Sequence, residues 1–328
     1  MKKTTLKDIA DALSLSVSTV SRAMNDKDEI EASTRKKVKQ KAQELGYRPN
    51  INARALRGKG TGLFGVVIDD NANPFYAEVV KGMEREARKR GLHLLLANTA
   101  ADLEEEEFAI EFLQHRGVDG ILIAPVSDEN PARVSQIKVP FVIVGRHFIK
   151  CDFCEVYNDE VTGGYLATRR LLSIGKSRIL IMLPEMTINP VRGRLRGYRN
   201  ALQEAGRLKD DGDLVRMWSP EEVRPNLRKL LHSSTKFDGI VAYNDLYALE
   251  AISLLRSEGI RIPDDIAVVG YDDIPFAAYF FPSLTTIALD KIWMGKEAVR
   301  MLSKVLEGKT IRKRQLVQTP ALIIRDSA

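Results

Sequence analysis

The chain has 328 residues, of which 44% are hydrophobic and 29% are charged, and its formal net charge at pH 7 is +6. The first 60 residues contain 14 Lys and Arg against 7 Asp and Glu, whereas the other 268 contain 36 against 37. The N-terminus is charged and amphipathic and no apolar run is long enough to span a bilayer, which excludes secretory and membrane segments and favours a cytoplasmic protein with no membrane partner.

Two short amphipathic helices joined by a tight turn are predicted at the N-terminus. Apolar residues recur at helical spacing in both: Leu6, Ile9, Ala10 and Leu13 in the first, Val17, Val20, Ala23 and Met24 in the second. A further short helix follows before residue 48. This order is typical of a helix-turn-helix domain.

The exposed face of the second predicted helix carries small hydroxyls, a guanidinium and an amide. These are Ser16, Ser18, Thr19, Ser21, Arg22 and Asn25. Hydroxyls of this size hydrogen-bond phosphates, and Arg22 has the geometry to reach O6 and N7 of a guanine. A merely solvated helix face would look similar, but the basic excess of this segment favours DNA binding.

The motifs of this segment resemble those of the lactose-repressor (LacI/GalR) family of bacterial transcription regulators, and the resemblance runs from about Thr4 to the C-terminus. The residues that carry it are Thr5-Leu6-x-Asp8-Ile9-Ala10, Ser16-x-x-Thr19-Val20-Ser21-Arg22-x-x-Asn25, Thr34-Arg35-x-x-Val38 and Leu45-Gly46-Tyr47-x-Pro49-Asn50-x-x-Ala53-Arg54-x-Leu56. The resemblance implies a sequence-specific regulator, with repression as the family's common mode.

The same resemblance implies which residues contact DNA. They are Thr5, Leu6, Ser16, Val17, Ser18, Thr19, Ser21, Arg22, Asn25, Thr34, Tyr47, Asn50, Ala53, Leu56 and Arg57. Among them Val17, Ser18 and Arg22 occupy the base-reading positions. One departure from the family is the acidic run Asp26, Asp28, Glu29 and Glu31, which puts some phosphate contacts in doubt.

Residues 50–57 correspond to the family's hinge helix. So short a helix is not stable alone in water, so folding coupled to operator binding is expected. Leu56 is expected to enter the minor groove as an apolar wedge that kinks the duplex. A plain linker leucine is the alternative, but the basic, glycine-containing stretch that follows, residues 57–60, favours the wedge.

From Gly62 onward, apolar strands alternate with amphipathic helices. The predicted strands are Leu63–Ile68, Leu92–Ala97, Gly120–Pro125, Phe141–Val144, Arg178–Leu183, Gly239–Ala242, Ala267–Tyr271 and Leu284–Ala288. This alternation indicates an α/β fold of parallel sheets covered on both faces, and its length favours two doubly wound lobes. We therefore expect a headpiece at 1–48, a hinge and linker at 49–60 and a two-lobed core at 61–328, with crossovers near 159–162, 285–291 and 315–322.

Polar and aromatic residues gather at the predicted carboxyl ends of the strands, where ligands bind in such folds. They include Asp69 to Tyr76, Gly145-Arg146, Pro184 to Arg194, Trp218, Asn244-Asp245 and Tyr271-Asp272-Asp273. Carboxylates, amides, a guanidinium and aromatic rings suit a polyhydroxylated ligand such as a sugar. The same residue types also cap helices or pack in cores, so the chemistry is not unique.

The family resemblance narrows this set. The implied effector contacts are Asn73, Phe75, Tyr76, Arg146, Arg194, Trp218, Asn244 and Asp272. Ile188 and Pro190 stand where the purine-binding branch has polar residues, which disfavours a purine corepressor. A nucleoside or a sugar phosphate stays open as an alternative effector. The resemblance also implies that the effector moves the lobes and so orders or melts the hinge, without fixing whether it induces or corepresses.

A two-fold dimer is expected because operators of this family are pseudo-palindromic double-stranded DNA. No leucine heptad follows Ile323-Ile324, which favours a homodimer over a tetramer. A solute-binding protein with the same core but no regulatory role is the alternative, since a fold does not fix a function. The basic headpiece and the missing signal peptide count against it.

An enzyme is not expected, because no G-x-G-x-x-G follows the first strand and no G-x-x-x-x-G-K-[ST] occurs. No cofactor is implied. Cys151 and Cys154 form a lone C-x-x-C, a spacing found in redox pairs and in half of a zinc site. Only His147 among the four histidines is near in sequence, so we expect two reduced thiols and no metal.

Overall fold

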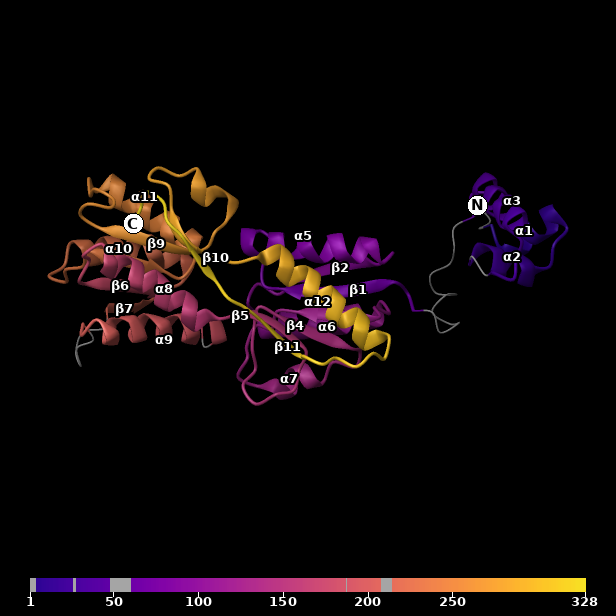
Figure 1. The fold of residues 1–328 in the computed structure, drawn as a ribbon, viewed down its shortest axis with the longest axis horizontal. Coiled ribbons are helices and arrows are strands. Elements are labelled where there is room, and N and C mark those ends of the chain that lie inside the picture. The colour runs from indigo at the N-terminus through magenta and orange to yellow at the C-terminus, as the bar shows by residue number, and fades with distance from the viewer. Residues whose placement is uncertain (1–3, 26–27, 48–59, 187, 208–213) are drawn as a thin grey trace. The chain divides into compact units, whose positions relative to one another are not determined.

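The computed structural model describes residues 4–25, 28–47, 60–186, 188–207 and 214–328. The chain divides into two compact units, Met1–Thr61 and Gly62–Ala328 (Figure 1). The described part of the first unit is helical, and the second unit is built of alternating strands and helices.

The first unit contains α1 (Leu6–Leu13), α2 (Val17–Met24) and α3 (Ala32–Glu44). A capping box begins α1: the Thr5 hydroxyl accepts from the backbone N–H of Asp8, and the Asp8 carboxylate accepts from that of Thr5. Ser14, with φ +53°, ends α1, and the Ser16 hydroxyl caps α2 by accepting from the N–H of Thr19 at 3.0 Å. Local sequence thus defines the tight turn between the two helices.

The buried faces of these helices form a small core. Its fully buried members are Ile9, Ala10, Val20, Ala23, Val38 and Ala42. The predicted helix-turn-helix with its apolar stripes is therefore confirmed. Val17 is the exception, because 44% of its surface is exposed and it lies outside this core.

The second unit contains the remaining elements. In chain order they are β1 (Leu63–Ile68), α5 (Pro74–Lys89), β2 (His93–Asn98), α6 (Leu103–His115), β3 (Gly120–Ile123), α7 (Pro131–Ser135), β4 (Phe141–Val144), β5 (Glu155–Asn158), α8 (Glu160–Ser173), β6 (Ile179–Leu183), α9 (Asn189–Glu204), β7 (Leu214–Met217), η1 (Pro220–Glu222), α10 (Val223–Leu231), β8 (Gly239–Ala242), α11 (Asp245–Ser257), β9 (Ala267–Asp272), η2 (Pro275–Ala278), β10 (Thr285–Ala288), α12 (Lys291–Leu306), β11 (Gln315–Gln318) and β12 (Ala321–Ile323).

The strands form two six-stranded sheets. The first lobe has the order β11-β5-β4-β3-β1-β2, and the second has β12-β10-β9-β8-β6-β7. Their paired strands are parallel except for β10 and β12, which are antiparallel. The expected α/β fold with two doubly wound lobes is confirmed, and β12 adds one antiparallel edge.

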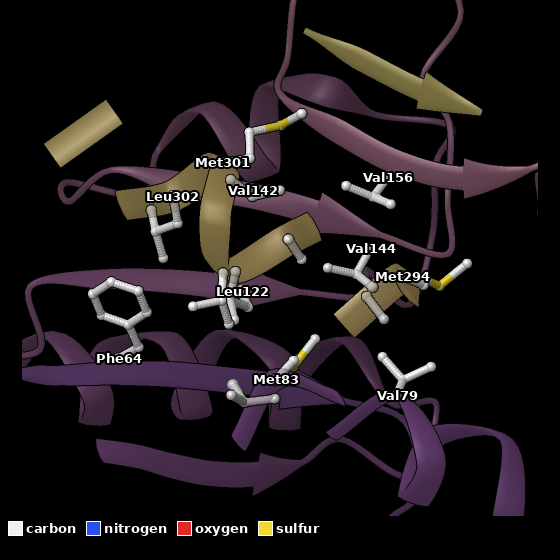
Figure 2. Packing of buried hydrophobic residues seen from close by; sticks show 14 of the residues in the cluster. Phe64, Val79, Met83, Leu122, Val142, Val144, Val156, Met294, Met301 and Leu302 are labelled. Carbon is white, nitrogen blue, oxygen red and sulfur yellow. The ribbon is translucent and has the colours of Figure 1, made fainter. Parts of the chain in front are cut away.

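The chain passes between the lobes three times in its described part: from β5 to α8, from β10 to α12, and from β11 to β12. The second passage returns α12 to the first lobe, where it packs beside α5 (Figure 1). Figure 2 shows Met294, Met301 and Leu302 of α12 in the same core as Phe64 and Met83. The core of the first lobe is therefore built from two distant parts of the sequence.

Glycines let two helix pairs approach backbone to backbone. A Cβ on Gly197 of α9 would lie 2.1 Å from the carbonyl oxygen of Val161 in α8. A Cβ on Gly295 of α12 would lie 2.0 Å from that of Val79 in α5. Close helix packing at a glycine thus occurs in both lobes. In the second lobe it holds α9, which carries Arg194, against α8.

Candidate functional site

A cavity of about 1010 Å³ lies between the two lobes of the second unit. It is bordered by residues at or just after the carboxyl ends of β1, β4, β5, β6, β8 and β9. Seven of the eight predicted effector residues line it: Asn73, Phe75, Tyr76, Arg146, Arg194, Asn244 and Asp272. The structure therefore brings these side chains together from both lobes.

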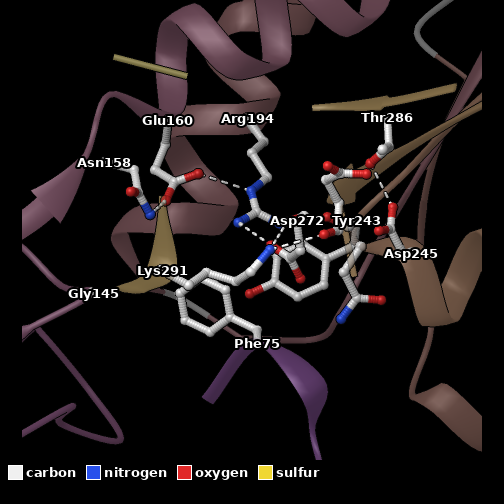
Figure 3. A network of polar contacts seen from close by, with 12 residues as sticks. Phe75, Gly145, Asn158, Glu160, Arg194, Tyr243, Asp245, Asp272, Thr286 and Lys291 are labelled. Carbon is white, nitrogen blue, oxygen red and sulfur yellow. Dashed lines mark hydrogen bonds and ion pairs between the residues drawn. The ribbon is translucent and has the colours of Figure 1, made fainter. Parts of the chain in front are cut away.

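Arg194 is the centre of the second-lobe side (Figure 3). Its Nε lies 2.9 Å from the Glu160 carboxylate, its Nη1 donates to the carbonyl of Tyr243, and its Nη2 lies 4.0 Å from Asp272. Its Cζ lies 3.6 Å from the ring centroid of Tyr271 and 4.5 Å from that of Tyr243. This buried guanidinium is held rigidly, as ligand recognition requires.

The charge of Arg194 is secure despite its burial. Burial alone lowers the pKa of a guanidinium, but the Glu160 carboxylate and the rings of Tyr271 and Tyr243 more than offset this, so the pKa of Arg194 is raised. The cleft therefore offers a fixed cation whose charge is partly balanced by a neighbouring carboxylate. A neutral ligand with several hydroxyls meets such a group without a large change in charge.

Asp272 is the last residue of β9 and has an unusual backbone conformation. Its φ is +107° and that of Asp273 is +50°, values that side chains other than glycine rarely adopt. Burial raises the pKa of the Asp272 carboxyl to about 8, an effect that Arg194 opposes and Asp245 reinforces. Near neutral pH the raised pKa favours the protonated carboxyl, which donates a hydrogen bond through its hydroxyl and accepts one through its carbonyl oxygen.

Asp245 anchors the turn beneath the site. Its carboxylate accepts from the Thr286 hydroxyl at 2.6 Å and from the backbone N–H of Ile274 at 2.8 Å (Figure 3). A Cβ on Gly270 would lie 2.2 Å from the same carboxylate, so glycine is needed there. Burial raises the pKa of Asp245 to about 6. Its role is to hold β9, β10 and the start of α11 together.

The first-lobe side is formed by the start of α5 and the end of β4. Asn73 caps α5 by accepting from the N–H of Phe75 at 3.0 Å, which places Phe75 and Tyr76 in the first turn. Arg146 donates from Nη2 to the Tyr76 hydroxyl at 3.3 Å and from Nη1 to the carbonyl of Gly145 at 3.1 Å. Among the described residues its buried Nε has no hydrogen-bond partner, which leaves a donor unused beside the cavity.

Asn73 and Asn244 each cap a helix and also line the cavity. Asn244 caps α11 by accepting from the N–H of Tyr247 at 3.0 Å, as Asn73 caps α5, and both line the cavity. Capping uses the side-chain oxygen, so the amide NH₂ group is what each offers a ligand. Helix capping and effector binding, which the sequence presented as alternatives, are therefore compatible.

Trp218 lies apart from this set. It packs in the hydrophobic core of the second lobe with 9% of its surface exposed, and its carbonyl accepts from the Tyr247 hydroxyl at 2.9 Å. It is absent from the described residues that line the cavity. Glu160 and Tyr243, by contrast, line the cavity although sequence reasoning did not select them. Glu160 follows β5, whose polar residues hid the strand from prediction.

Most of the residues predicted to contact DNA lie at the surface of the first unit. Thr5, Ser16, Val17, Ser18, Arg22 and Asn25 are exposed, and Leu6, Thr19, Ser21, Thr34 and Tyr47 are half-buried. Asn50, Ala53, Leu56 and Arg57 lie outside the described residues. The exposed face of α2 therefore presents the predicted recognition groups together.

Arg22 already has an acidic neighbour in the ligand-free chain. Its Nη1 lies 3.2 Å from the carboxylate of Glu29, and both side chains are largely exposed, at 60% and 69%. Arg35 lies 4.0 Å from Asp28. The acidic run identified in the sequence thus pairs with two cations of the headpiece, and DNA would have to compete for them.

The two cysteines are free thiols. Cys154 is buried in the first lobe, and burial raises the pKa of its thiol, which disfavours the reactive thiolate. His147 is occupied with Glu155, whose carboxylate lies 2.7 Å from its Nδ1. In the described ranges no group of three or more potential metal ligands was found, and no helix there is long and apolar enough to cross a membrane.

Comparison with known proteins matches both units. The family model for bacterial regulatory proteins of the LacI family matches residues 5–50, and that for periplasmic binding proteins and the sugar binding domain of the LacI family matches residues 61–324. The chain is 32% identical over 331 residues to the HTH-type transcriptional regulator DegA of Bacillus subtilis (strain 168), covering 99% of this chain and 98% of that one.

Two solved structures extend the comparison. A lac repressor dimer bound to operator and the anti-inducer ONPF has a TM-score of 0.89 at 25% identity, with 99% of both chains covered. A complex of the transcriptional regulator CelR with cellobiose has a TM-score of 0.74 at 31% identity, covering 99% of this chain and 100% of that one. Both similarities therefore include the helical unit as well as the two lobes.

Proposed function

Since the chain belongs to the LacI family of DNA-binding transcription regulators, we propose that it is a homodimeric repressor whose operator affinity is controlled by a sugar held between its two lobes. The operator is pseudo-palindromic double-stranded DNA, and the protein acts in the cytoplasm, where that DNA lies. Its work is binding and not catalysis.

The observation that carries the proposal is the convergence of Arg194 and Asp272 with side chains of the first lobe in one cavity. A guanidinium, a carboxyl group and two amides supply donors and acceptors for vicinal hydroxyls. The rings of Phe75 and Tyr76 offer apolar faces for a pyranose. The description of the matching core family as sugar-binding and the cellobiose complex of a relative support a saccharide.

A purine is less suited to this cavity. Ile188 and Pro190 line it with apolar surface and offer a ring no hydrogen bonds from their side chains. A sugar phosphate would meet the carboxylates of Asp69 and Glu160, which oppose a further negative charge. The neutral saccharide is therefore the class that the lining favours.

Regulation follows from the position of the cavity. A ligand that contacts Arg194 in the second lobe and Arg146 in the first changes how the lobes sit, because its contacts depend on both. The first lobe begins at β1, directly after the segment at 49–60 that we assign to the hinge. In a dimer, movement of the first lobe of each subunit brings the two hinge segments together or moves them apart. Ligand binding therefore changes DNA affinity, and DNA binding changes ligand affinity by the same factor.

DNA recognition is assigned to the exposed face of α2. Ser18 and Arg22 project into the major groove there, and Val17, exposed and apolar, suits contact with a thymine methyl group. The basic excess of residues 1–60 supplies the salt-dependent, sequence-independent part of the affinity. The headpiece is assigned to 1–48 and the effector-binding and dimerisation core to 61–328.

The test begins with a thermal-shift panel of mono- and disaccharides, sugar phosphates and nucleosides on the full chain, because a ligand that binds only the native state raises Tm. Each hit is then added to a binding assay with genomic DNA fragments selected by the protein itself. A saccharide that raises Tm and changes DNA affinity supports the proposal.

Two results would contradict parts of it. If only nucleosides or sugar phosphates raised Tm and changed DNA affinity, the saccharide assignment would be wrong and the assignment as a DNA-binding regulator would stand. A saccharide that binds tightly without any effect on DNA affinity would favour solute binding without a regulatory role.

A further inference from the structure

Lys291 occupies a junction between the lobes. It is the first residue of α12, at the point where the chain returns from the second lobe to the first, and only 5% of its surface is exposed. A buried ammonium group is stable only if charged and polar partners replace the lost water. The partners of the Lys291 ammonium group show which segments of the two lobes it joins.

The ammonium group has three partners, one for each of its N–H groups. It donates to the carbonyl of Asp272, to the carbonyl of Asp273 at 2.9 Å, and it lies 3.1 Å from the carboxylate of Glu78. Asp272 and Asp273 belong to the second lobe, whereas Glu78 belongs to α5 of the first. Figure 3 shows the Lys291 side chain reaching toward the group formed by Arg194 and Asp272.

The two carbonyls belong to the residues whose backbone is left-handed, with φ of +107° and +50°. Such conformations persist only where surrounding contacts fix them. Lys291 supplies contacts of this kind from the opposite lobe. The direction of the Asp272 carboxyl, at the end of β9 and at the edge of the cavity, therefore depends on a side chain of α12.

We propose that Lys291 is a positioning residue: it holds the Asp272 carboxyl in the cleft and ties it through Glu78 to α5, whose first turn carries Phe75 and Tyr76. The proposal rests on the proposed role of Asp272 in effector binding. Movement of the lobes that separates Lys291 from the 272–273 turn releases Asp272, so ligand contact and lobe arrangement are linked through one side chain.

A titration of Asp272 tests this without any ligand. The full chain is labelled with ¹³C at aspartate side-chain carboxyl carbons, and the Asp272 signal is assigned by its loss in Asp272→Asn. The charged groups that face Asp272 are Arg194, Asp245, Glu160 and Lys291. Removing the cation of Lys291 in Lys291→Met should raise the titration midpoint above about 8, because this ammonium group lowers the pKa of Asp272.

Three further variants test the charge of Lys291, its position and its partner Glu78. Lys291→Gln keeps a hydrogen-bond donor without the charge, so it should fold more readily and shift the midpoint in the same direction. Lys304→Met makes the same chemical change at an exposed position of α12 and should leave the midpoint where it is. Hydrogen exchange at the backbone of residues 270–275 should be faster in both Lys291 variants, and Glu78→Gln should give an intermediate rate.

The outcomes are distinguishable from those of the proposed function. An Asp272 midpoint that stays the same in Lys291→Met and Lys291→Gln overturns the positioning role, even if a saccharide such as cellobiose binds and regulates the wild type. A shifted midpoint together with faster hydrogen exchange at residues 270–275, but no saccharide binding, supports the positioning role and rejects the saccharide. Where cellobiose binds, Lys291→Met should weaken its affinity roughly tenfold and Lys304→Met should not.

Discussion

Asp128 of the first lobe and Arg192 of the second form an ion pair of 2.8 Å between the lobes. The Asp128 side chain is fully buried, and its other carboxylate oxygen accepts from the backbone N–H of Asn189 at the start of α9. A carboxylate from one lobe thus satisfies the N-terminus of a helix in the other, where a negative charge is favourable. Because α9 also carries Arg194, this contact lies close to the ligand cavity.

Replacing Asp128 by Asn should loosen this contact. Arg192 is 41% exposed, so the loss is smaller than for a fully buried pair, and we expect the free energy of unfolding to fall by roughly 1–3 kcal/mol in urea denaturation. Glu129→Gln alters the adjacent exposed carboxylate and should change it by less than about 0.5 kcal/mol. Equal effects of the two substitutions would show that Asp128 does not join the lobes.

Arg194→Ala should abolish the saccharide response while DNA binding persists, because the headpiece does not depend on this guanidinium. The variant leaves Glu160 buried without its cation, a loss of roughly 3–5 kcal/mol. Adding Glu160→Gln should restore much of the stability. It should not restore saccharide binding, which calorimetric titration measures. Arg196→Ala, exposed on the same helix, is the control and should leave both properties intact.

The stability of the second unit should fall as pH rises from about 4 to about 8. In the unfolded chain Asp272 titrates near 3.8, whereas in the folded chain burial raises its pKa to about 8. Between these two pH values the folded state binds more protons than the unfolded state, so raising the pH favours unfolding. Asp245, whose pKa is raised to about 6, contributes in the same direction up to about pH 6.

Asp272→Asn removes the titrating carboxyl. The loss of unfolding free energy between low and high pH should therefore be smaller in the variant than in the wild type, by an amount on the order of a few kcal/mol. Urea denaturation at pH 5 and at pH 9 measures it. If wild type and variant lost the same stability between the two pH values, Asp272 would not be the group that titrates.

Glu29→Gln should strengthen DNA binding by releasing Arg22 from its exposed partner. The expected gain is several-fold at low salt and smaller at high salt, since both the ion pair and phosphate attraction are screened. Fluorescence anisotropy with fragments selected by the protein measures it. Glu31→Gln makes the same charge change two residues away, and an equal gain there would mean that only net charge matters.

Gly197→Ala should destabilise the second lobe by roughly 1–3 kcal/mol or more. The new Cβ would lie 2.1 Å from the carbonyl oxygen of Val161 and 2.5 Å from the backbone nitrogen of Tyr165, neither of which moves without shifting α8. Asn200→Ala, on the exposed side of α9, is the control for thermal unfolding. If the Tm of Gly197→Ala equalled that of Asn200→Ala, the close packing of α8 and α9 would contribute little to stability.

Eight mainly apolar strands could be predicted from sequence, whereas four strands that contain polar residues or lie at the sheet edges could not. Every predicted strand has a counterpart within two residues at each end, because continuous runs such as Leu63–Ile68 reflect burial on both faces. The strands β5, β7, β11 and β12 were missed. Glu155–Asn158 and Gln315–Gln318 pair with each other at one side of a sheet, and their polar residues interrupt the apolar run that predicted the other strands.

Site residues that act through distant contacts also escaped prediction. Arg194 and Asp272 follow family motifs, so their positions could be inferred, although the pairing of Arg194 with Glu160 depends on the passage from β5 to α8. Lys291 has no local pattern, since its three partners lie far from it in sequence. Trp218 shows the converse, because an aromatic residue near a strand end looks the same whether it lines a cavity or packs in a core.

The return of α12 to the first lobe has a consequence for synthesis on the ribosome. Met294 and Leu302 belong to the core that Phe64 and Met83 begin, yet the whole run from α8 to β10 is translated between them. The nascent first lobe therefore waits with an apolar face uncovered while the second lobe's strands emerge. The unfinished chain thus exposes apolar surface during synthesis, and a contiguous gene fragment that encodes the complete first lobe also encodes the strands of the second lobe from β6 to β10.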